Sequence, residues 1–317
     1  MNRRTIAFLA LLNFSSSLFT GLFAQQGENE QARKYRATGK MAAERKKIAD
    51  QMEYSLQKEL LDKWYPRSID SLYGGFLSAW TYDFKPDSDQ DKMIVTQARH
   101  TWVNAKASER YPNRQYYKSG ARQGFLFLRD ILWDQVYGGF YTLVDREGHE
   151  KKGYFAPKEA YGNAFGIYSL AAYYHSSGDT AALDLAKRAF LWLEAHSHDP
   201  VYKGYFQHMQ EDGRPIKRTA DIPSTAETGY KDQNSSIHLL EAFTELYQVW
   251  KDELLRERLQ EMLLLIRDKI RTPRGSLILF SSQTGPPYHS GIPAGNASCN
   301  TVASTTYPSD MMSRQPT

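Results

Sequence analysis

The sequence has little cysteine, little imbalance of charge and few long apolar runs. Its single cysteine, Cys299, excludes an intramolecular disulfide, so packing must stabilise the fold. The 40 basic and 36 acidic side chains are too evenly balanced for a nucleic-acid partner recognised by charge. A mean hydropathy of −0.61 argues against a polytopic membrane protein. A chain of 317 residues with 41% apolar side chains is long enough to bury a sizeable core.

The first 24 residues predict a signal peptide. Arg3 and Arg4 precede an apolar stretch over 6–12, and Ala24 offers a small residue at a cleavage position. We therefore expect an exported protein, periplasmic or secreted, with no membrane attachment after the signal is removed. The alternative is an uncleaved anchoring helix over 6–24.

A repeat organises the middle of the chain. Three Gly-aromatic turns begin at positions 73, 137 and 202, and each follows an aspartate by three residues. These turns are Tyr73-Gly74-Gly75-Phe76 after Asp70, Tyr137-Gly138-Gly139-Phe140 after Asp134, and Tyr202-Lys203-Gly204-Tyr205-Phe206 after Asp199. Between them, apolar residues recur at three- and four-residue spacing, which predicts helices. The predicted helices cover 28–64, 92–111, 116–132, 158–176, 180–196, 231–250 and 253–270.

Paired helices that repeat along a chain bury their apolar faces by stacking on one another. The stack is either an open solenoid or a closed toroid of inner and outer helices. Six units of this period would need roughly 390 residues, so a closed six-unit ring needs more residues than the chain has.

Two predicted helices carry side chains suited to proton transfer and to the stabilisation of an anion. Asn234, His238 and Glu241 lie on successive turns of one helix, where an imidazole between an amide and a carboxylate could move a proton. Arg99 lies one turn before Trp102 on the other, and a guanidinium beside an aromatic ring suits an anionic intermediate. The alternatives are a capping Asn with a core-edge His, a surface ion pair, and a Trp that fills the core. No third ligand at a metal-binding spacing accompanies the histidine.

Three segments together resemble the N-acylglucosamine 2-epimerase superfamily, most closely its cellobiose 2-epimerase branch. They are Gln97-Ala98-Arg99-x-x-Trp102, Tyr161-Gly162-Asn163-Ala164-Phe165-x-x-Tyr168, and Lys231-Asp232-x-Asn234-x-x-x-His238-Leu239-x-Glu241-Ala242. The resemblance covers about residues 41–279. It implies an all-α fold, an incomplete (α/α)6 toroid of about four helical-hairpin units with short β-turn strands on one rim. The partial epimerase domain would cover 25–279.

The resemblance implies an isomerase that interconverts gluco- and manno-configured sugars at the reducing end. A base removes the proton at C2, and the resulting enediolate is reprotonated on the other face without a metal or nucleotide cofactor. By position, Arg99 and His238 are the catalytic residues. The residues expected to bind the sugar are Tyr161, Asn234, Trp102, Asn163 and Glu241. A small-molecule sugar is the expected partner, rather than a nucleic acid or a membrane.

Residues 280–317 depart from the family pattern. The family's two acid/base histidines, one in a Ser-(Tyr/Phe)-Gly-His-Asp-(Ile/Val)-Glu segment, have no counterpart in this sequence. In a shifted reading frame, Asp310-Met311-Met312-Ser313 gives Tyr or His, then Asp, then Val when the serine codon is TCN. We therefore interpret 280–317 as an out-of-frame tail, with a natural disordered tail as the alternative.

The missing histidines predict that this chain is inactive or nearly so, because both faces of C2 need a proton-transfer group. Two other functions remain open from the sequence. One is a glycoside hydrolase or lyase on the same toroid, which would need a carboxylic acid of raised pKa. The other is a non-catalytic glycan-binding fragment that uses the aromatic rings.

Overall fold

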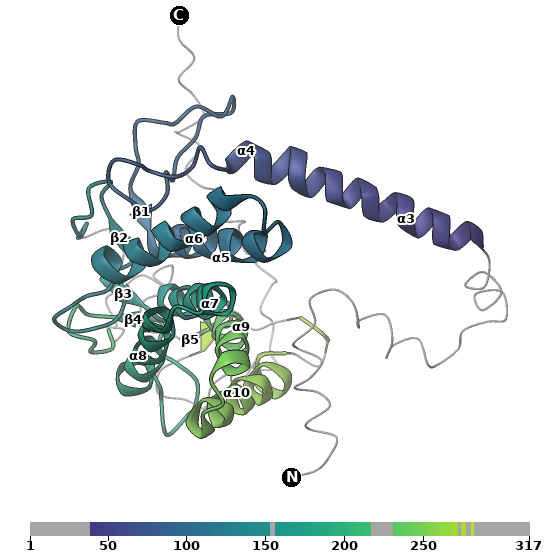
Figure 1. The fold of residues 1–317 in the computed structure, drawn as a ribbon. Helices are drawn as coiled ribbons and strands as arrows, with labels where there is room; N and C mark the ends of the chain where they lie inside the picture. The colour runs from purple at the N-terminus through teal and green to yellow at the C-terminus, as the bar shows by residue number, and fades with distance from the viewer. Residues whose placement is uncertain (1–38, 153–155, 217–230, 272–273, 277–279, 282–317) are drawn as a thin grey trace, which may run out of the picture.

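A computed structural model describes residues 39–152, 156–216, 231–271, 274–276 and 280–281. Helices dominate this part of the chain (Figure 1). They are α3 (Gly39–Tyr54), α4 (Asp62–Trp64), α5 (Ile94–Arg110), α6 (Gln115–Phe127), α7 (Ala160–Ser177), α8 (Thr180–His196), α9 (Gln233–Val249) and α10 (Glu253–Leu265), with π-helical turns η2 (Ser55–Leu61), η3 (Leu128–Leu132) and η4 (Ile266–Ile270). The turns η2, η3 and η4 directly follow α3, α6 and α10.

The predicted helices after residue 90 are confirmed to within two residues at each end. For the first predicted helix, residues 28–38 lie outside the described part of the chain, as do the predicted signal peptide and most of the predicted tail. Three predicted helix starts are instead two-residue strands that lead into α5, α7 and α9. These strands form three antiparallel pairs: β1 (Lys92–Met93) with β2 (Leu143–Val144), β3 (Lys158–Glu159) with β4 (His208–Met209), and β5 (Lys231–Asp232) with β6 (Phe280–Ser281).

The helices form two layers. Helices α5, α7 and α9 pack side by side in chain order, and we call them the inner helices. Helices α6, α8 and α10 each pack against the inner helix that precedes them in the chain. The described residues thus contain three inner–outer pairs and one further helix, α3 to α4, in agreement with an incomplete toroid. The main hydrophobic core runs between the two layers through all three pairs.

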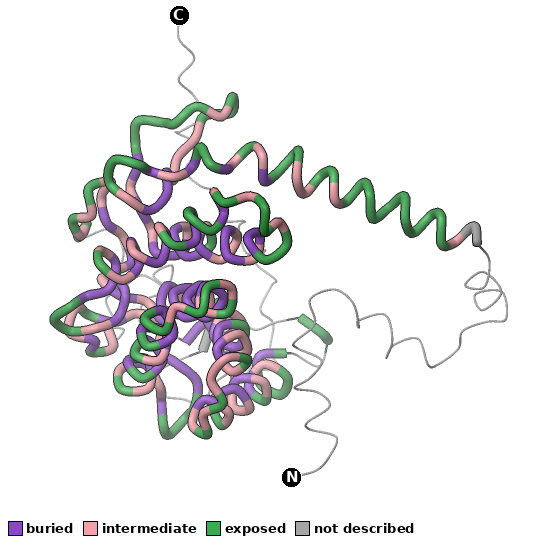
Figure 2. The backbone as a smooth tube through the Cα atoms, viewed as in Figure 1, coloured by how far each residue is buried: buried purple, intermediate pink, exposed green. Residues whose placement is uncertain are grey.

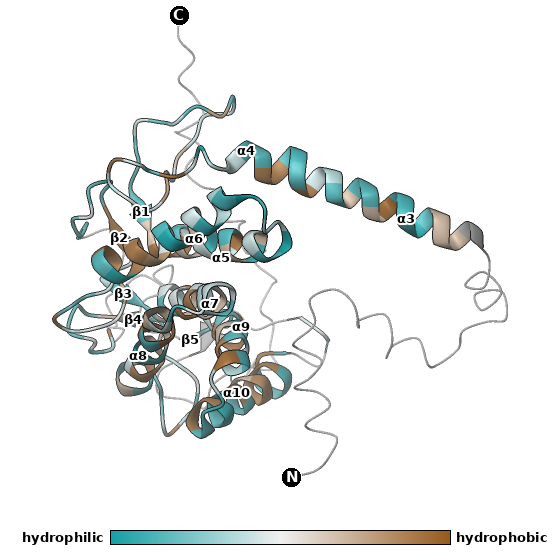
Figure 3. Cartoon of the chain, viewed as in Figure 1, coloured by the Kyte–Doolittle hydropathy of each residue, from teal (hydrophilic) through white to brown (hydrophobic). Residues whose placement is uncertain are grey.

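Helix α3 projects away from the pairs (Figure 1), and Figure 2 shows it exposed along most of its length. Its anchor is at its C-terminal end, where Tyr111 donates a hydrogen bond of 2.7 Å to Glu53. Its surface is mainly hydrophilic with isolated apolar positions (Figure 3), of which Met52 is 68% exposed. No helix within the described ranges is long and apolar enough to span a bilayer.

A buried lysine stands just before each inner helix and binds the aspartate that precedes a Gly-aromatic turn. The Nζ–Oδ2 distances are 3.0 Å for Lys92–Asp70, 2.6 Å for Lys158–Asp134 and 2.6 Å for Lys231–Asp199. The lysine side chains are 0–1% exposed. We call these three ion pairs the Lys–Asp locks. They explain why an aspartate precedes every turn of the repeat.

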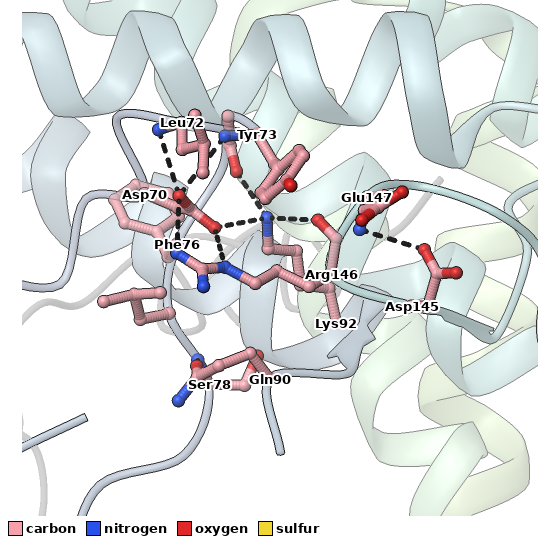
Figure 4. Close-up of polar contacts among 12 residues, drawn as sticks. Asp70, Leu72, Tyr73, Phe76, Ser78, Gln90, Lys92, Asp145, Arg146 and Glu147 are labelled. Atoms are coloured by element: carbon pink, nitrogen blue, oxygen red, sulfur yellow. Dashed lines mark hydrogen bonds and ion pairs between the residues drawn. The ribbon is translucent and has the colours of Figure 1, made fainter. Parts of the chain in front are cut away.

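The first lock carries an additional arginine (Figure 4). The carboxylate of Asp70 accepts hydrogen bonds from Lys92, from the Arg146 guanidinium and from the backbone N–H groups of Leu72 and Tyr73. Burial alone would raise the pKa of this carboxyl group, but the bonds from Arg146 and Lys92 outweigh it and lower the pKa to about 2. The carboxylate is therefore charged across the physiological pH range.

Glycine is required in the turns by both conformation and space. Gly138 and Gly139 have φ values of +70° and +75°, which L-residues with a side chain rarely adopt. A Cβ atom at either position would lie 2.8 Å from the Trp192 ring. The indole Nε1 of Trp192 also donates a 2.9 Å hydrogen bond to the carbonyl oxygen of Tyr137. The outer helix α8 thereby holds the turn in place.

Candidate functional site

Three of the predicted site residues meet around one phenylalanine. The Arg99 guanidinium carbon lies 4.5 Å from the centroid of the Phe165 ring, and the His238 ring centroid lies 4.7 Å from it. The Tyr161 ring lies 5.1 Å from Phe165 and 5.2 Å from His238, edge to face in both cases. We call Arg99, Tyr161, Phe165 and His238 the Phe165 cluster. The three inner helices all contribute to it.

A second set of side chains lies two helical turns further along the same faces. Lys106, Tyr168 and Glu245 each follow a member of the cluster by seven residues, which is about 10.5 Å along a helix. The Lys106 ammonium and the Glu245 carboxylate form an ion pair of 2.7 Å that joins α5 to α9. Burial is the largest cause that raises the pKa of Tyr168, and the negative charges of the nearby Glu245 and Glu241 carboxylates raise it further. The repeated seven-residue spacing shows that the three helices present matching faces.

Glu241 contacts the imidazole of the cluster. Its Oε2 lies 2.7 Å from Nδ1 of His238, one turn back on α9. The His238 side chain is 20% exposed and the Glu241 side chain 53% exposed. A carboxylate next to one ring nitrogen favours the tautomer that carries its proton there, which leaves the other nitrogen free to accept a hydrogen bond.

Arg99 has an exposed side chain and no carboxylate within ion-pair distance among the described residues. Arg129 provides a contrast, since it also lies over a ring, Phe125 at 5.2 Å, but binds the Asp130 carboxylate at 2.6 Å. The guanidinium of Arg99 therefore keeps its N–H donors available. Such a group can stabilise an oxyanion that forms during a reaction.

Trp102 and Asn234 lie on the same helices as the cluster. The half-buried Trp102 ring stacks on Tyr168 at 5.2 Å with an interplanar angle of 15°. Its Nε1 atom is buried and has no hydrogen-bond partner within the described structure. Asn234 is exposed in the first turn of α9 and does not cap that helix. The cap is Asp232, whose Oδ1 accepts a 2.8 Å hydrogen bond from the N–H of Ser235.

The structure corrects the expectation for Asn163, because its side chain is completely buried. Its Oδ1 accepts a 3.0 Å hydrogen bond from the N–H of Phe140, and its Nδ2 donates to the carbonyl of Glu159 at 2.8 Å. Gln97 forms the matching bond to the N–H of Phe76 in the preceding repeat, at 2.7 Å. These amides attach the Gly-Gly-Phe turns to the inner helices, so Asn163 has a structural role rather than a sugar-binding one.

His100 adjoins Arg99 in the chain but belongs to a different environment. Its ring stacks on Phe76 at 4.8 Å, and its Nδ1 lies 2.6 Å from the hydroxyl of Tyr65. Burial lowers the pKa of His100 to about 4, so the ring is neutral at physiological pH.

The sequence analysis did not identify Phe165 as a candidate site residue. Its position four residues after Tyr161, on the same face of one helix, is the signal that indicates it. Within the described ranges, no group of three or more His, Cys, Asp or Glu side chains could hold a metal ion.

The sequence is similar to a known family and to individual proteins. Residues 74–280 match the family model of N-acylglucosamine 2-epimerase (GlcNAc 2-epimerase). A cellobiose 2-epimerase of Bacteroides fragilis is 30% identical over 225 residues, which are 70% of this chain and 56% of that protein. A cellobiose 2-epimerase of Ruminococcus albus is 31% identical over 224 residues, 69% of this chain and 55% of that protein.

The fold is similar to solved structures as well. The cellobiose 2-epimerase of Spirochaeta thermophila superposes with a TM-score of 0.67 and 30% identity, over 76% of this chain and 58% of that one. The cellobiose 2-epimerase of Bacillus thermoamylovorans gives a TM-score of 0.66 with 25% identity, over 75% and 60%. The chain spans about half the length of the curated relatives it matches.

Proposed function

Because this chain belongs to the N-acylglucosamine 2-epimerase family, we propose that the Phe165 cluster is the substrate site of a sugar 2-epimerase. Its substrates would be reducing-end sugars of the cellobiose or mannobiose type, or N-acylglucosamine. The observation that carries the proposal is the guanidinium of Arg99, which has no paired carboxylate among the described residues and shares one aromatic ring with the imidazole of His238.

In epimerisation at C2, the guanidinium of Arg99 and the imidazole of His238 would each have a role. Removal of the C2 proton from an open-chain sugar moves the electron pair of the C–H bond toward the carbonyl group and places one negative charge on O1 of the enediolate. The free N–H donors of Arg99 would stabilise this charge. With its Nδ1 directed to Glu241, His238 would bind a sugar hydroxyl through Nε2 or exchange a proton there. Tyr161, in contact with the imidazole, would add an aromatic face and a hydroxyl for the sugar.

We also propose that this polypeptide alone turns over little substrate. Inversion at C2 needs proton-transfer groups on both faces of the carbon. His238 is the one imidazole in the Phe165 cluster as described. The out-of-frame origin of 280–317 is part of this proposal, and nucleotide sequencing across the codons of residues 275–280 tests it. We also propose that the N-terminal segment directs export of the protein.

Binding and exchange measurements test the site. Cellobionate, an open-chain anion that mimics the enediolate, should bind the purified chain, and Arg99→Met should weaken that binding at least about tenfold, the equivalent of a lost charge-assisted hydrogen bond. Arg129→Met is the matched control, because Arg129 also lies over a ring but is already paired. Equal cellobionate binding by wild type and Arg99→Met would contradict the proposed site.

NMR of cellobiose in D2O separates the remaining functions. Slow or absent deuterium incorporation at C2 is expected for this chain. Rapid incorporation would support the epimerase site and overturn the low-activity proposal. Release of a monosaccharide would indicate a hydrolase, and shift changes that do not depend on Arg99 would indicate a glycan-binding protein.

A further inference from the structure

Phe165 is the buried centre of the cluster. It is 5% exposed, whereas Arg99 is exposed and His238 and Tyr161 are partly exposed. Its ring also meets Tyr168 edge to face at 6.5 Å, so contacts on several sides fix its position. The ring therefore provides a rigid surface against which more mobile groups can be placed.

The contact with Arg99 has a specific electrostatic consequence. A guanidinium over an aromatic ring is attracted by the negative face of the ring. This attraction orients the group but uses none of its N–H donors and cancels none of its charge. A carboxylate in the same place would do both, as Asp130 does for Arg129.

We infer that Phe165 is a positioning residue that sets the preference of the site for anionic over neutral open-chain sugars. It holds Arg99 in place with its charge uncompensated, on the ring that His238 also contacts. The inference rests on the proposed function. It predicts that loss of the ring reduces anion preference while the site still binds sugar.

The experiment compares two probes by isothermal titration calorimetry: cellobionate, which carries a carboxylate at C1, and cellobiitol, its neutral open-chain analogue. The measured quantity is the ratio of their dissociation constants. Phe165→Leu should lower the preference for cellobionate about two- to fivefold, the range of a partly exposed cation–π contact. Phe165→Tyr keeps an aromatic ring at this position and should retain the wild-type ratio of dissociation constants. Phe165→Met provides the same comparison if the Leu variant does not fold.

Phe125→Leu is the matched control. It removes a buried ring of the outer helix α6 that contacts Arg129 in η3, and it should leave the ratio unchanged. A purely structural role for Phe165 would weaken both probes equally and keep the ratio, which would overturn the inference. An unchanged ratio in Phe165→Leu while Arg99→Met abolishes the preference would also overturn it, with the proposed function intact. Failure of the wild type to bind either probe would instead reject the proposed function, and the inference with it.

Discussion

Nδ1 of His238 and Oε2 of Glu241 are 2.7 Å apart, one turn from each other on α9. The carboxylate can only accept a hydrogen bond, so in the neutral ring the proton resides on Nδ1 and Nε2 keeps its lone pair. The tautomer of the one imidazole in the cluster is thus set by its own helix.

Glu241→Gln should release this tautomer, because an amide can donate as well as accept. Nitrogen-15 NMR of the imidazole should show His238 moving from the Nδ1-protonated form to a mixture of both forms. Glu109→Gln is the matched control, since Glu109 contacts Nδ1 of His175 at 2.7 Å. It should change the signals of His175 and leave those of His238 unaltered. Unchanged His238 signals in Glu241→Gln would contradict the assignment.

Lys158→Met should destabilise the fold strongly. The substitution leaves the Asp134 carboxylate buried without its ammonium partner, and loss of one member of a buried pair costs about 3–5 kcal/mol of unfolding free energy. Urea denaturation measures the change. Lys46→Met removes an ion pair to Asp50 whose side chains are 76% and 66% exposed, and it should cost less than about 1 kcal/mol. Similar losses for both variants would refute the importance of the locks.

Gly139→Ala and Gly178→Ala separate backbone strain from steric overlap. Both glycines have positive φ, +75° and +73°, so each alanine should cost about 1 kcal/mol or more in strain. Only at Gly139 does the added Cβ meet a ring, that of Trp192, whereas nothing lies within 4 Å at Gly178. Gly139→Ala should therefore cost about 1–3 kcal/mol more in thermal or urea unfolding. Equal costs would show that Trp192 moves aside without penalty.

His100 predicts a pH dependence of stability. Burial lowers its pKa to about 4 in the folded chain, whereas the unfolded chain takes up the proton near the ordinary value of 6.5. The unfolded state thus binds more protons between these values, so stability falls as pH decreases from 6.5 to 4, by up to about 3 kcal/mol from this group. The difference between wild type and His100→Gln in urea unfolding, followed across that pH range, measures the effect. Parallel pH profiles for the two proteins would exclude it.

Much of the fold could be predicted from the sequence because the repeat carries its own periodicity. The apolar spacing located α8 to the residue, and the Gly-aromatic turns marked the connections that precede α5, α7 and α9. The strand starts at Lys92, Lys158 and Lys231 could not be distinguished from helix. Those lysines are buried by partners 22 to 32 residues earlier in the chain, as the three Lys–Asp pairs show.

The site was predicted less completely for a similar reason. The motif positions predicted Arg99, Tyr161 and His238 as candidates, and the structure brings these three together around Phe165. A motif does not reveal which of its members face each other. Asn163 lies two residues after Tyr161 and points to the Gly-Gly-Phe turn instead of the cluster. Phe84 shows the same limit. With a φ of +59°, it occupies the turn position that Gly148 and Gly213 fill in the two later turns with the same backbone hydrogen bonds. Its ring contacts that of Trp64, which the sequence did not reveal.

The lysines of the first two locks, Lys92 and Lys158, each have a second neighbour beyond their own connection. Lys92 donates to the backbone carbonyl of Arg146 at 2.9 Å, and Lys158 donates to that of Glu211 at 2.5 Å, each in the loop that follows the next Gly-aromatic turn. Each of these two ammonium groups thus spans two successive repeats, and opening one repeat would leave a polar group of its neighbour without its hydrogen bond. Such nearest-neighbour coupling favours cooperative denaturation of the repeats that these two lysines join.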